Sequence, residues 1–390
     1  MRRTVIPMLF FLLSLVSTGW WQAQAQLQTK PCVITFDGPG AGTAPNQGQG
    51  TVPAQITDSG LIVGSFVDAS GVSHGFFRDL DGRITTLDAQ GGGSGAGEGT
   101  VANGITDDGI VVGGVFDGSG VFHGFFGRPG GPFTIFDAPG AGTAPNQGTN
   151  ATAINSEGTI SGDYVDANGV PHGYVRFRGG KITSFDPSGS VFTAADTLGI
   201  NRVGAITGPY LDASSVVHGF VRVSDGRILT FDAPGAGTGP NQGTVPSMIT
   251  DMGTIPGAYQ DTNNVIHAFL RFADGTIATF DVPGAGTGPG QGTLANAANL
   301  EGHIVGIFTD ANGVSHGFTR TPGGKNSFFD VPGEGIQATI PLSINCSGVV
   351  TGFFVDANGV NHGFLRFPSR MEGSRVHDDF LCRFSDRPRE

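Results

Sequence analysis

The sequence predicts an all-β protein, a seven-bladed β-propeller built from four-stranded antiparallel blades. Three observations lead to this fold class. One histidine recurs every 46 to 49 residues, an apolar residue followed by aspartate recurs at similar intervals, and turn-forming residues divide each interval into four short β-like runs. Four-strand repeats of this length are typical of propeller blades, whereas the coils of a parallel β-helix, the weaker alternative, are shorter.

The repeat is defined by three sets of marker residues. The histidines are His74, His123, His172, His218, His267, His316 and His362. An aspartate stands six residues before each of them, at Asp68, Asp117, Asp166, Asp212, Asp261, Asp310 and Asp356. The apolar-Asp marker ends in Asp37, Asp88, Asp137, Asp186, Asp232, Asp281 and Asp330. Seven units of about 48 residues therefore fill positions 33 to 368.

Each unit contains four predicted strands. In the first unit they are 52–56, 61–67, 72–78 and 83–87, and the turns between them all end in glycine, which adopts the positive φ that such turns need. The first strand of each unit is rich in small residues, which suits the innermost position, where blades crowd around the axis. No segment after the N-terminal apolar run combines a sustained 3.6-residue periodicity with helix caps, so almost no helix is expected.

The two ends of the repeat array complement each other. The last unit stops after its third strand, at Phe367-Pro368, and a lone fourth strand, 33–36, precedes the first unit. Pairing this strand with the last unit would close the ring and remove two exposed strand edges. We therefore predict a closing blade with three strands from the C-terminal end and one from the N-terminal end.

The N-terminal residues predict export. Arg2 and Arg3 precede an apolar run at 5–16, and Ala23-Gln24-Ala25 forms a cleavage site, so 1–25 is predicted to be a secretory signal peptide. The propeller then spans 26–368, and 369–390 is a charged C-terminal tail. No later apolar run approaches transmembrane length, so no membrane insertion is expected after cleavage.

The charge of the chain argues against several classes of partner. The formal net charge is −12, and removal of the signal peptide leaves 19 basic against 33 acidic residues, a charge of −14. There are only three lysines and no basic patch, so no nucleic-acid binding is expected. Acidity of this size favours solubility and disfavours anionic surfaces.

The repeat units resemble the HAF family of exported bacterial repeats, which is named for a His-Ala-Phe signature and has a G-I-N-x-x-G turn. The signature stands literally at His267-Ala268-Phe269 and as His-Gly-Phe or His-Gly-Tyr in the other six units. The turn is present at 154–158 and 344–348. The resemblance covers all seven units. It implies an extracellular or cell-surface protein of unassigned activity, with the periplasm as the other compartment, and supplies no catalytic residues.

The stretch 310–318 contains a G-x-S-x-G pattern, which is found at the nucleophile of serine hydrolases. Its serine is present at Ser73 and Ser315 only, and the pattern lies across a hairpin instead of a strand-turn-helix, so we interpret the match as accidental. One Asp and one His per unit also supply too few ligands for zinc or calcium.

A structural role explains the repeated Asp and His better. A turn beginning at Asp310 places Phe308 opposite His316 across the hairpin, where the two rings would pack together. The same offset places Phe66, Tyr164, Tyr210, Tyr259 and Phe354 opposite their histidines, and only Val115 breaks the pattern. The aspartate is expected to accept backbone N–H bonds in the turn.

The linkers between units are the other candidate for function. Their sequence is Asp-x-Pro-Gly-Ala-Gly-Thr-x-Pro-Asn-Gln-Gly-Thr from Asp137 and from Asp232, and from Asp37 it matches as far as Gly48. It is read first as a rigid connection. They are also predicted to share one face with the Asp-x-x-Gly turns, and polar loops on a rigid scaffold often bind ligands. The divergent linkers 89–100, 187–196 and 331–338 would then carry the specific contacts.

Three cysteines remain after cleavage: Cys32, Cys346 and Cys382. A disulfide is plausible in an exported protein. The predicted strand order separates Cys32 from Cys346, so these two are not expected to bridge each other. Cys382 on the tail could reach either of them, and Cys346–Cys382 is the pair chosen here, with Cys32 free.

Two functions follow from these observations. The first is a secreted, non-enzymatic, monomeric binding or surface-interaction module for an unknown extracellular protein, glycan or small molecule, with no cofactor. The second is an extracellular hydrolase or lyase with its site, and a calcium ion, at the mouth of the central channel. Single-copy polar residues on inner strands would support the second, and Asp196, Asn150 and Asn299 are the suggestive ones.

Overall fold

The computed structural model describes residues 32–193 and 199–368, which form 29 β-strands and no helix. The chain divides into two compact units, Val33–Arg366 and a second that combines Met1–Cys32 with Phe367–Glu390. Only residues 32, 367 and 368 of the second unit are described, so the predicted signal peptide (1–25) and tail (369–390) lie outside the described residues. In the described part of the chain, no helix is long and apolar enough to cross a membrane.

The strands of the unit Val33–Arg366 fall into groups that repeat one hairpin pattern. The first groups are β2 (Gly50–Ile56), β3 (Ile62–Val67), β4 (Ser73–Arg78), β5 (Ile84–Leu87); β6 (Gly99–Ile105), β7 (Val111–Phe116), β8 (Phe122–Gly127), β9 (Thr134–Phe136); and β10 (Gly148–Ile154), β11 (Ile160–Val165), β12 (Pro171–Arg176), β13 (Ile182–Phe185). The next has a two-part inner strand: β14 (Ser190–Thr193), β15 (Gly199–Ile200), β16 (Ile206–Asp212), β17 (Val217–Arg222), β18 (Ile228–Phe231).

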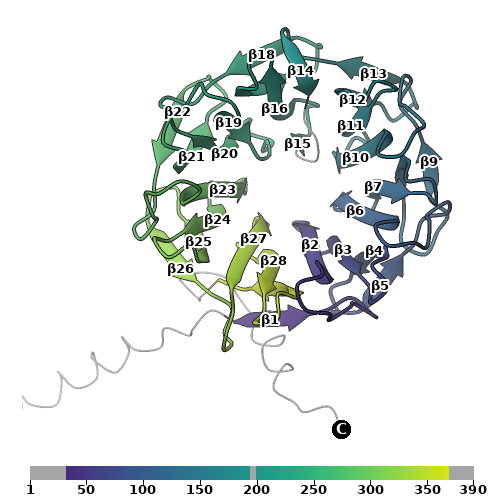
Figure 1. Ribbon diagram of the computed structural model, residues 1–390, viewed down its shortest axis with the longest axis horizontal. Coiled ribbons are helices and arrows are strands. Elements are labelled where there is room, and N and C mark those ends of the chain that lie inside the picture. Colours follow the sequence, from purple (N-terminus) through teal and green to yellow (C-terminus); the bar gives the residue numbers. More distant parts are fainter. Residues whose placement is uncertain (1–31, 194–198, 369–390) are drawn as a thin grey trace, which may run out of the picture. The chain divides into compact units, whose positions relative to one another are not determined.

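The remaining groups follow in the same order. They are β19 (Gly243–Pro246), β20 (Ile255–Gln260), β21 (Ile266–Arg271), β22 (Ile277–Phe280); β23 (Gly292–Ala298), β24 (Ile304–Thr309), β25 (Ser315–Arg320), β26 (Asn326–Phe329); and β27 (Ala338–Ile344), β28 (Val350–Val355), β29 (Asn361–Arg366), β1 (Val33–Phe36). Figure 1 shows β2, β6, β10, β15, β23 and β27 nearest a common centre and β5, β9, β13, β18, β22 and β26 at the periphery.

The N-terminal strand β1 occupies the outer position of the last group. It pairs antiparallel with β29, in a register that sets Val33 opposite Arg366 and Phe36 opposite Gly363. Residues more than 300 positions apart in the sequence therefore share one sheet. Residues 367 and 368, the last that the structure describes, do not form a strand.

Consecutive groups are joined by single parallel bridges, so the sheet is mixed and not purely antiparallel. The inner strand of one group begins beside the third strand of the preceding group, as at Ser73 opposite Gly99 and at Asn361 opposite Gly50. A Cβ on Gly50, whose φ is +106°, would lie 2.0 Å from the carbonyl oxygen of Asn361. Glycine is thus required by the close approach of two backbones.

The core lies between the groups. The third strands contribute the largest buried rings, and Phe76, Phe125, Tyr174, Phe220, Phe269, Phe318 and Phe364 are all 0% exposed. An outer-strand phenylalanine of the preceding group packs against most of these rings edge to face, as Phe36 does on Phe76 with centroids 6.0 Å apart. Burial of each ring contributes about 1.5–3 kcal/mol to folding.

An arginine at the end of the third strand stacks on the same outer-strand phenylalanine. The guanidinium carbon lies 4.4 to 5.2 Å from the ring centroid in the pairs Arg78–Phe36, Arg176–Phe136, Arg222–Phe185, Arg271–Phe231, Arg320–Phe280 and Arg366–Phe329. At the junction of β5 and β8 both partners differ, because Leu87 replaces the phenylalanine and Gly127 replaces the arginine. We refer to this contact as the Arg–Phe stack.

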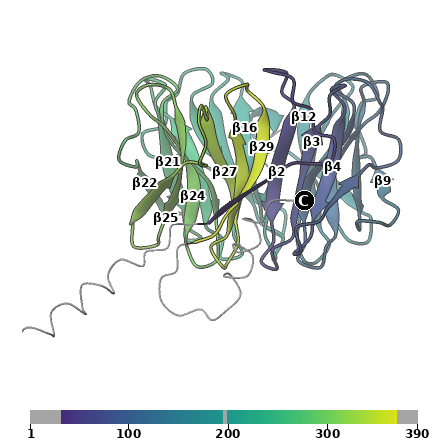
Figure 2. The same ribbon diagram turned by 90° about the horizontal axis from the view of Figure 1, so that it is seen from below.

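The connections lie on two faces (Figure 2). Topology puts the linkers and the turns that follow the second strands at one end of the strands, which we call the linker face. The turns that follow the first and third strands, such as 57–60 and 79–82, lie at the other end, which we call the turn face.

Candidate functional site

The repeated histidines pack across their hairpins as the register predicted. His316 on β25 pairs with Phe308 on β24, and the rings stack with centroids 5.0 Å apart and an interplanar angle of 29°. The same stacking, at 5.0 or 5.1 Å, is found for Phe66–His74, Tyr164–His172, Tyr210–His218, Tyr259–His267 and Phe354–His362. Val115 lies opposite His123.

The aspartate six residues before each histidine closes the turn. Asp310 Oδ1 accepts hydrogen bonds from the backbone N–H groups of Asn312 (2.8 Å) and Val314 (2.9 Å). The Val314 bond is the main cause that holds the pKa of Asp310 below its usual range. Asp68, Asp117, Asp166, Asp212, Asp261 and Asp356 accept the same pair of bonds in their turns.

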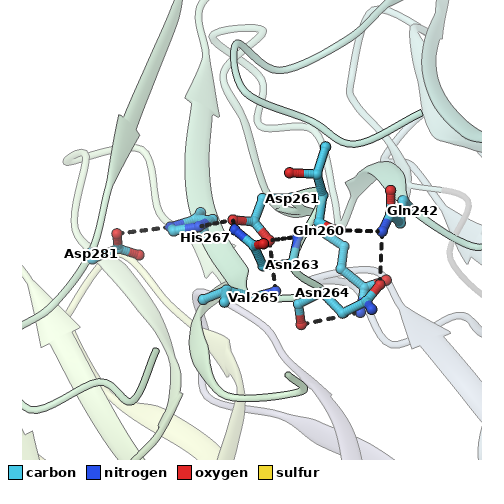
Figure 3. Close-up of polar contacts among 9 residues, drawn as sticks. Gln242, Gln260, Asp261, Asn263, Asn264, Val265, His267 and Asp281 are labelled. Carbon is cyan, nitrogen blue, oxygen red and sulfur yellow. Dashed lines mark hydrogen bonds and ion pairs between the residues drawn. The ribbon is translucent and has the colours of Figure 1, made fainter. Parts of the chain in front are cut away.

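The structure adds a third member that sequence reasoning missed. His267 Nδ1 lies 2.9 Å from Asp281 Oδ2, and its Nε2 lies 3.7 Å from Asp261 Oδ2, so the ring is held between two carboxylates (Figure 3). In every unit the aspartate of the apolar-Asp marker makes the Nδ1 contact, and for His362 that partner is Asp37. The constant spacing of 14 residues from His74 to Asp88 and onward was the signal available in the sequence.

The linkers are fixed by their own side chains. Gln242 Nε2 donates to Asn264 Oδ1 at 2.9 Å (Figure 3). Gln242 Oε1 accepts from the N–H of Gly239 at 3.0 Å. Gln49, Gln147, Gln291 and Gln337 each donate to a backbone carbonyl in the adjoining Asp-x-x-Gly turn. These contacts favour the rigid-connection interpretation. The expectation that divergent linkers carry a binding site stays a prediction.

The G-x-S-x-G match has no nucleophile geometry. Ser315 begins strand β25, and its hydroxyl shares a hydrogen bond of 3.1 Å with the Thr309 hydroxyl across the hairpin. A nucleophile elbow requires a strand-turn-helix, and no helix occurs in residues 32–193 and 199–368.

The inner strands surround a cavity of about 1240 Å³, to which none of the repeated Asp and His residues contributes. The fifth residue of each regular inner strand lines it, and this position holds Ala54, Asn103, Thr152, Asn296 and Leu342, with Ser247 at the corresponding site after β19. Phe116 and Phe122, an edge-to-face pair with centroids 4.2 Å apart, add an aromatic wall. The cavity lining is therefore irregular, although the scaffold around it repeats.

The most polar part of this wall lies on β6, β10 and β11. Asn103 Nδ2 donates to Asn150 Oδ1 at 3.1 Å, and Asp163, 5% exposed, is the cross-strand neighbour of Asn150. Tyr174 donates to the Asn150 carbonyl at 3.0 Å, and burial followed by the charge of Asp163 raises the pKa of its hydroxyl. The structure thus brings Asn150 to the cavity as expected. Asp196 lies outside the described residues.

Asn299 has a different role from the one expected of a single-copy residue. Its Oδ1 accepts from the N–H of His303 at 2.9 Å and its Nδ2 donates to the Asn345 carbonyl at 2.9 Å. Asn155, Asn201 and Asn345 make the equivalent bonds in their own turns. Asn299 is therefore a repeated turn residue that links neighbouring groups.

The turn-face end of the cavity carries charged residues that clamp adjacent turns. Asp107 Oδ1 accepts from the Asp58 N–H at 3.0 Å, Asp251 Oδ1 from the Arg202 N–H at 2.7 Å, and Asp58 Oδ1 from the Cys346 N–H at 2.8 Å. Within the described residues, no group of three or more His, Cys, Asp or Glu side chains is placed to hold a metal ion. Calcium at the channel stays an untested prediction.

The predicted disulfide Cys346–Cys382 is wrong. Cys346 is a free thiol, and its Sγ lies 3.2 Å from Asp58 Oδ2 at the cavity mouth. Cys32, which was expected to be free, is disulfide-bonded. The turn that holds Cys346 follows an inner strand, β27, whereas Cys32 precedes β1 at the outer edge of its group. Cys382 lies outside the described residues.

Comparisons with known proteins bear on the fold. No family model and no curated protein matches the sequence. A catalytically inactive virginiamycin B lyase from Staphylococcus aureus with quinupristin is similar in structure, with a TM-score of 0.55, 15% identity, and coverage of 87% of this chain and 100% of that one. A lectin from Burkholderia pseudomallei has a TM-score of 0.55, 11% identity, and coverage of 82% and 96%.

A third similar structure is a puromycin hydrolase, with a TM-score of 0.54 and 12% identity. The match covers 82% of this chain and 53% of the hydrolase, so the present chain corresponds to about half of that protein. Identities this low show the fold alone. The chain has a propeller-like all-β fold whose structural neighbours include a lectin and enzymes, and both a binding and an enzymatic role are compatible with it.

Proposed function

We propose that the chain is an exported, seven-bladed β-propeller that binds a neutral, hydroxyl-rich ligand such as a glycan in its central cavity. Seven sequence repeats and the pairing of β1 with β29 support a closed ring of seven blades. The N-terminal sequence supports export, to the cell surface, the medium or the periplasm. The protein acts as a monomeric binding module in this proposal, with domains at 1–25, 26–368 and 369–390.

The observation that carries the proposal is the irregular lining of the cavity. Propeller positions that serve architecture are nearly constant from repeat to repeat, as the histidine and its two aspartates are. The fifth inner-strand position instead varies among alanine, asparagine, threonine, serine and leucine. Variation at the positions that line a cavity of about 1240 Å³ supports recognition of one asymmetric ligand there.

The chemistry of the wall indicates the class of ligand. Asn103, Ser247 and Asn296 donate to carbonyl oxygens of neighbouring strands, so their amide and hydroxyl oxygens remain as acceptors that suit sugar hydroxyls. Val101, Val245 and Leu294 alternate with them and suit the C–H faces of a sugar ring. Asp58, Asp107 and Asp251 at the turn-face mouth disfavour an anionic ligand.

A glycan array probed with the purified protein tests the proposal. Val245, 38% exposed, points a side chain to the cavity, and Leu229, 48% exposed, lies on outer strand β18 away from it. We expect Val245→Trp to weaken glycan binding at least about tenfold, because the indole occupies the cavity, and Leu229→Trp to leave binding unchanged. Equal binding by the two variants, or no glycan bound by the folded protein, would contradict the central-cavity site.

One observation favours the alternative function, an extracellular hydrolase or lyase. Asp163 is a carboxylate, 5% exposed, in the cavity wall, and a carboxylate in such a place suits a general base. A panel of polysaccharide and ester substrates tests this alternative. Turnover that disappears in Asp163→Asn, while glycan binding persists, would favour the enzyme, and binding without turnover would favour the binding module.

A further inference from the structure

A second cavity, of about 320 Å³, lies on the turn face between the β19–β22 and β23–β26 groups. It adjoins the central cavity, with which it shares Thr250, Ala298, Asn299 and Leu300, but its own wall is mainly apolar. Leu270, Phe272, Ala278 and Phe280 line one side, and Leu300 and Ile304 line the other. This volume falls within the range of small-molecule sites.

The cavity lies beside an outer-strand position whose residue differs between groups. Ala278 on β22 pairs with Leu270, and in the preceding group the same register position on β18 holds Leu229, opposite Val221. Other groups carry Thr85, Thr183 and Ser327 there. The small side chain of Ala278 leaves space that a leucine would fill. The rim also exposes apolar side chains: Met252 is 71% exposed, Leu300 47% and Phe272 40%. Clustered exposed apolar residues around a cavity mark a binding surface.

One cationic side chain stands in this apolar wall. Arg320 lies with its guanidinium carbon 4.5 Å from the Phe280 centroid, and its Nη1 donates to the Gly324 carbonyl at 2.9 Å and to Asn326 Oδ1 at 3.0 Å. In the described residues, the arginines that form ion pairs with carboxylates are Arg128 and Arg227. The charge of Arg320 is thus not neutralised by a carboxylate of the described chain.

The hydrogen bonds of Arg320 leave part of its guanidinium unused. Both bonds use Nη1, and Arg320 lines the cavity, so Nη2 remains as a donor for a ligand there. A guanidinium beside an apolar pocket is suited to a carboxylate that carries an apolar body.

We propose that this cavity binds a small amphipathic monocarboxylate, with the apolar chain between the two strand groups and the carboxylate on Arg320. The site differs from that of the glycan-binding proposal, because none of the fifth inner-strand residues lines it, although the two cavities meet at Asn299 and Leu300. Charge complementarity selects the anion, and the apolar wall selects its hydrocarbon part.

Calorimetric titration of the purified protein with octanoate, and separately with octan-1-ol, tests the proposal. We expect one octanoate per chain, and binding of octan-1-ol that is at least about tenfold weaker because it lacks the charge. Arg320→Gln should reduce octanoate affinity to that of octan-1-ol. Octanoate binding as weak as octan-1-ol binding to the wild-type protein would overturn the role of Arg320.

The space itself is tested by Ala278→Leu, which copies the residue that β18 carries at the same register position. Its matched control is Ser327→Leu, at the same position of β26, outside the cavity. We expect the first to weaken octanoate binding at least about tenfold and the second to leave it unchanged. Met252→Glu, on the exposed rim, should also weaken octanoate binding, and it should not destabilise the fold because Met252 is not part of the core. If both Ala278→Leu and Met252→Glu bind octanoate like the wild type, the site is refuted.

Discussion

The Arg–Phe stack between β1 and β4 holds the N-terminal strand against the first complete group. Phe36 lies 5.2 Å from the Arg78 guanidinium carbon and 6.0 Å from the Phe76 centroid. We consider the substitutions Phe36→Leu and Arg78→Met, singly and together. The chain itself contains the precedent, since Leu87 and Gly127 stand in these two positions at the next junction.

The expected magnitude follows from the contacts that are lost. A partly desolvated cation–π contact contributes about 0.5–2 kcal/mol, and an edge-to-face aromatic pair about 0.5–1.5 kcal/mol beyond area burial. Burial lowers the pKa of Arg78, and its Nε is buried with no hydrogen-bond partner, so the ring face is a main source of compensation for its charge. Phe36→Leu should therefore lower the free energy of unfolding by about 1–3 kcal/mol.

The assay is urea unfolding of the four proteins, followed by far-ultraviolet circular dichroism. A double-mutant cycle should return a coupling free energy of about 0.5–2 kcal/mol between Phe36 and Arg78. Arg128→Met is the matched control, because Arg128 pairs with Asp108 and stacks on no ring among the described residues. A Phe36–Arg78 coupling no larger than the Phe36–Arg128 coupling, within about 0.3–0.5 kcal/mol, would refute the reasoning.

Three further predictions concern the backbone, the turns and the free thiol. Gly50→Ala should lower the free energy of unfolding, measured in urea, by at least about 2 kcal/mol more than Gly40→Ala does. Both glycines have a positive φ, but only at Gly50 would a Cβ clash with a neighbouring backbone. Equal losses in the two variants would contradict this. Asp310, with a pKa below its usual 3.8, stabilises the fold above that pH and loses the contribution as pH falls through the lowered value. Unfolding between pH 6 and 3 should thus be less pH-dependent in Asp310→Asn. Burial, and after it the hydrogen bond to Asp58, raises the pKa of the Cys346 thiol. Maleimide labelling of the native protein should therefore increase steeply with pH and vanish in Cys346→Ser. Labelling that persists in Cys346→Ser would argue against Cys346 as the free thiol.

The strand order and hairpin registers could be predicted from the sequence because they are local. Alternating strands bounded by glycine turns fix which residues face each other, so the contact of Phe308 with His316 followed from the turn at Asp310. The pairing of β1 with β29 is a long-range contact, yet it was also predictable, since each end lacked one strand.

The parts that the sequence analysis missed have different causes. The bond from His74 to Asp88 lies within one hairpin, and extending the register that sets Gly75 opposite Leu87 would have predicted it. The role of Asn299 depends on a carbonyl 46 residues away in the next turn, which no local pattern indicates. The choice of Cys346 as the paired cysteine failed because the sequence does not fix where the residues after 368 run.

The pairing of β1 with β29 also affects the order in which the chain can become ordered. β1 is among the first residues synthesised, and its partner, Asn361–Arg366, is among the last. The hairpins between them can form from neighbouring residues, whereas β1 must wait until almost the whole chain is available. During synthesis, β1 therefore stays a lone strand with unpaired backbone groups. A chain that ends before residue 361 leaves Val33–Phe36 with no strand in its register.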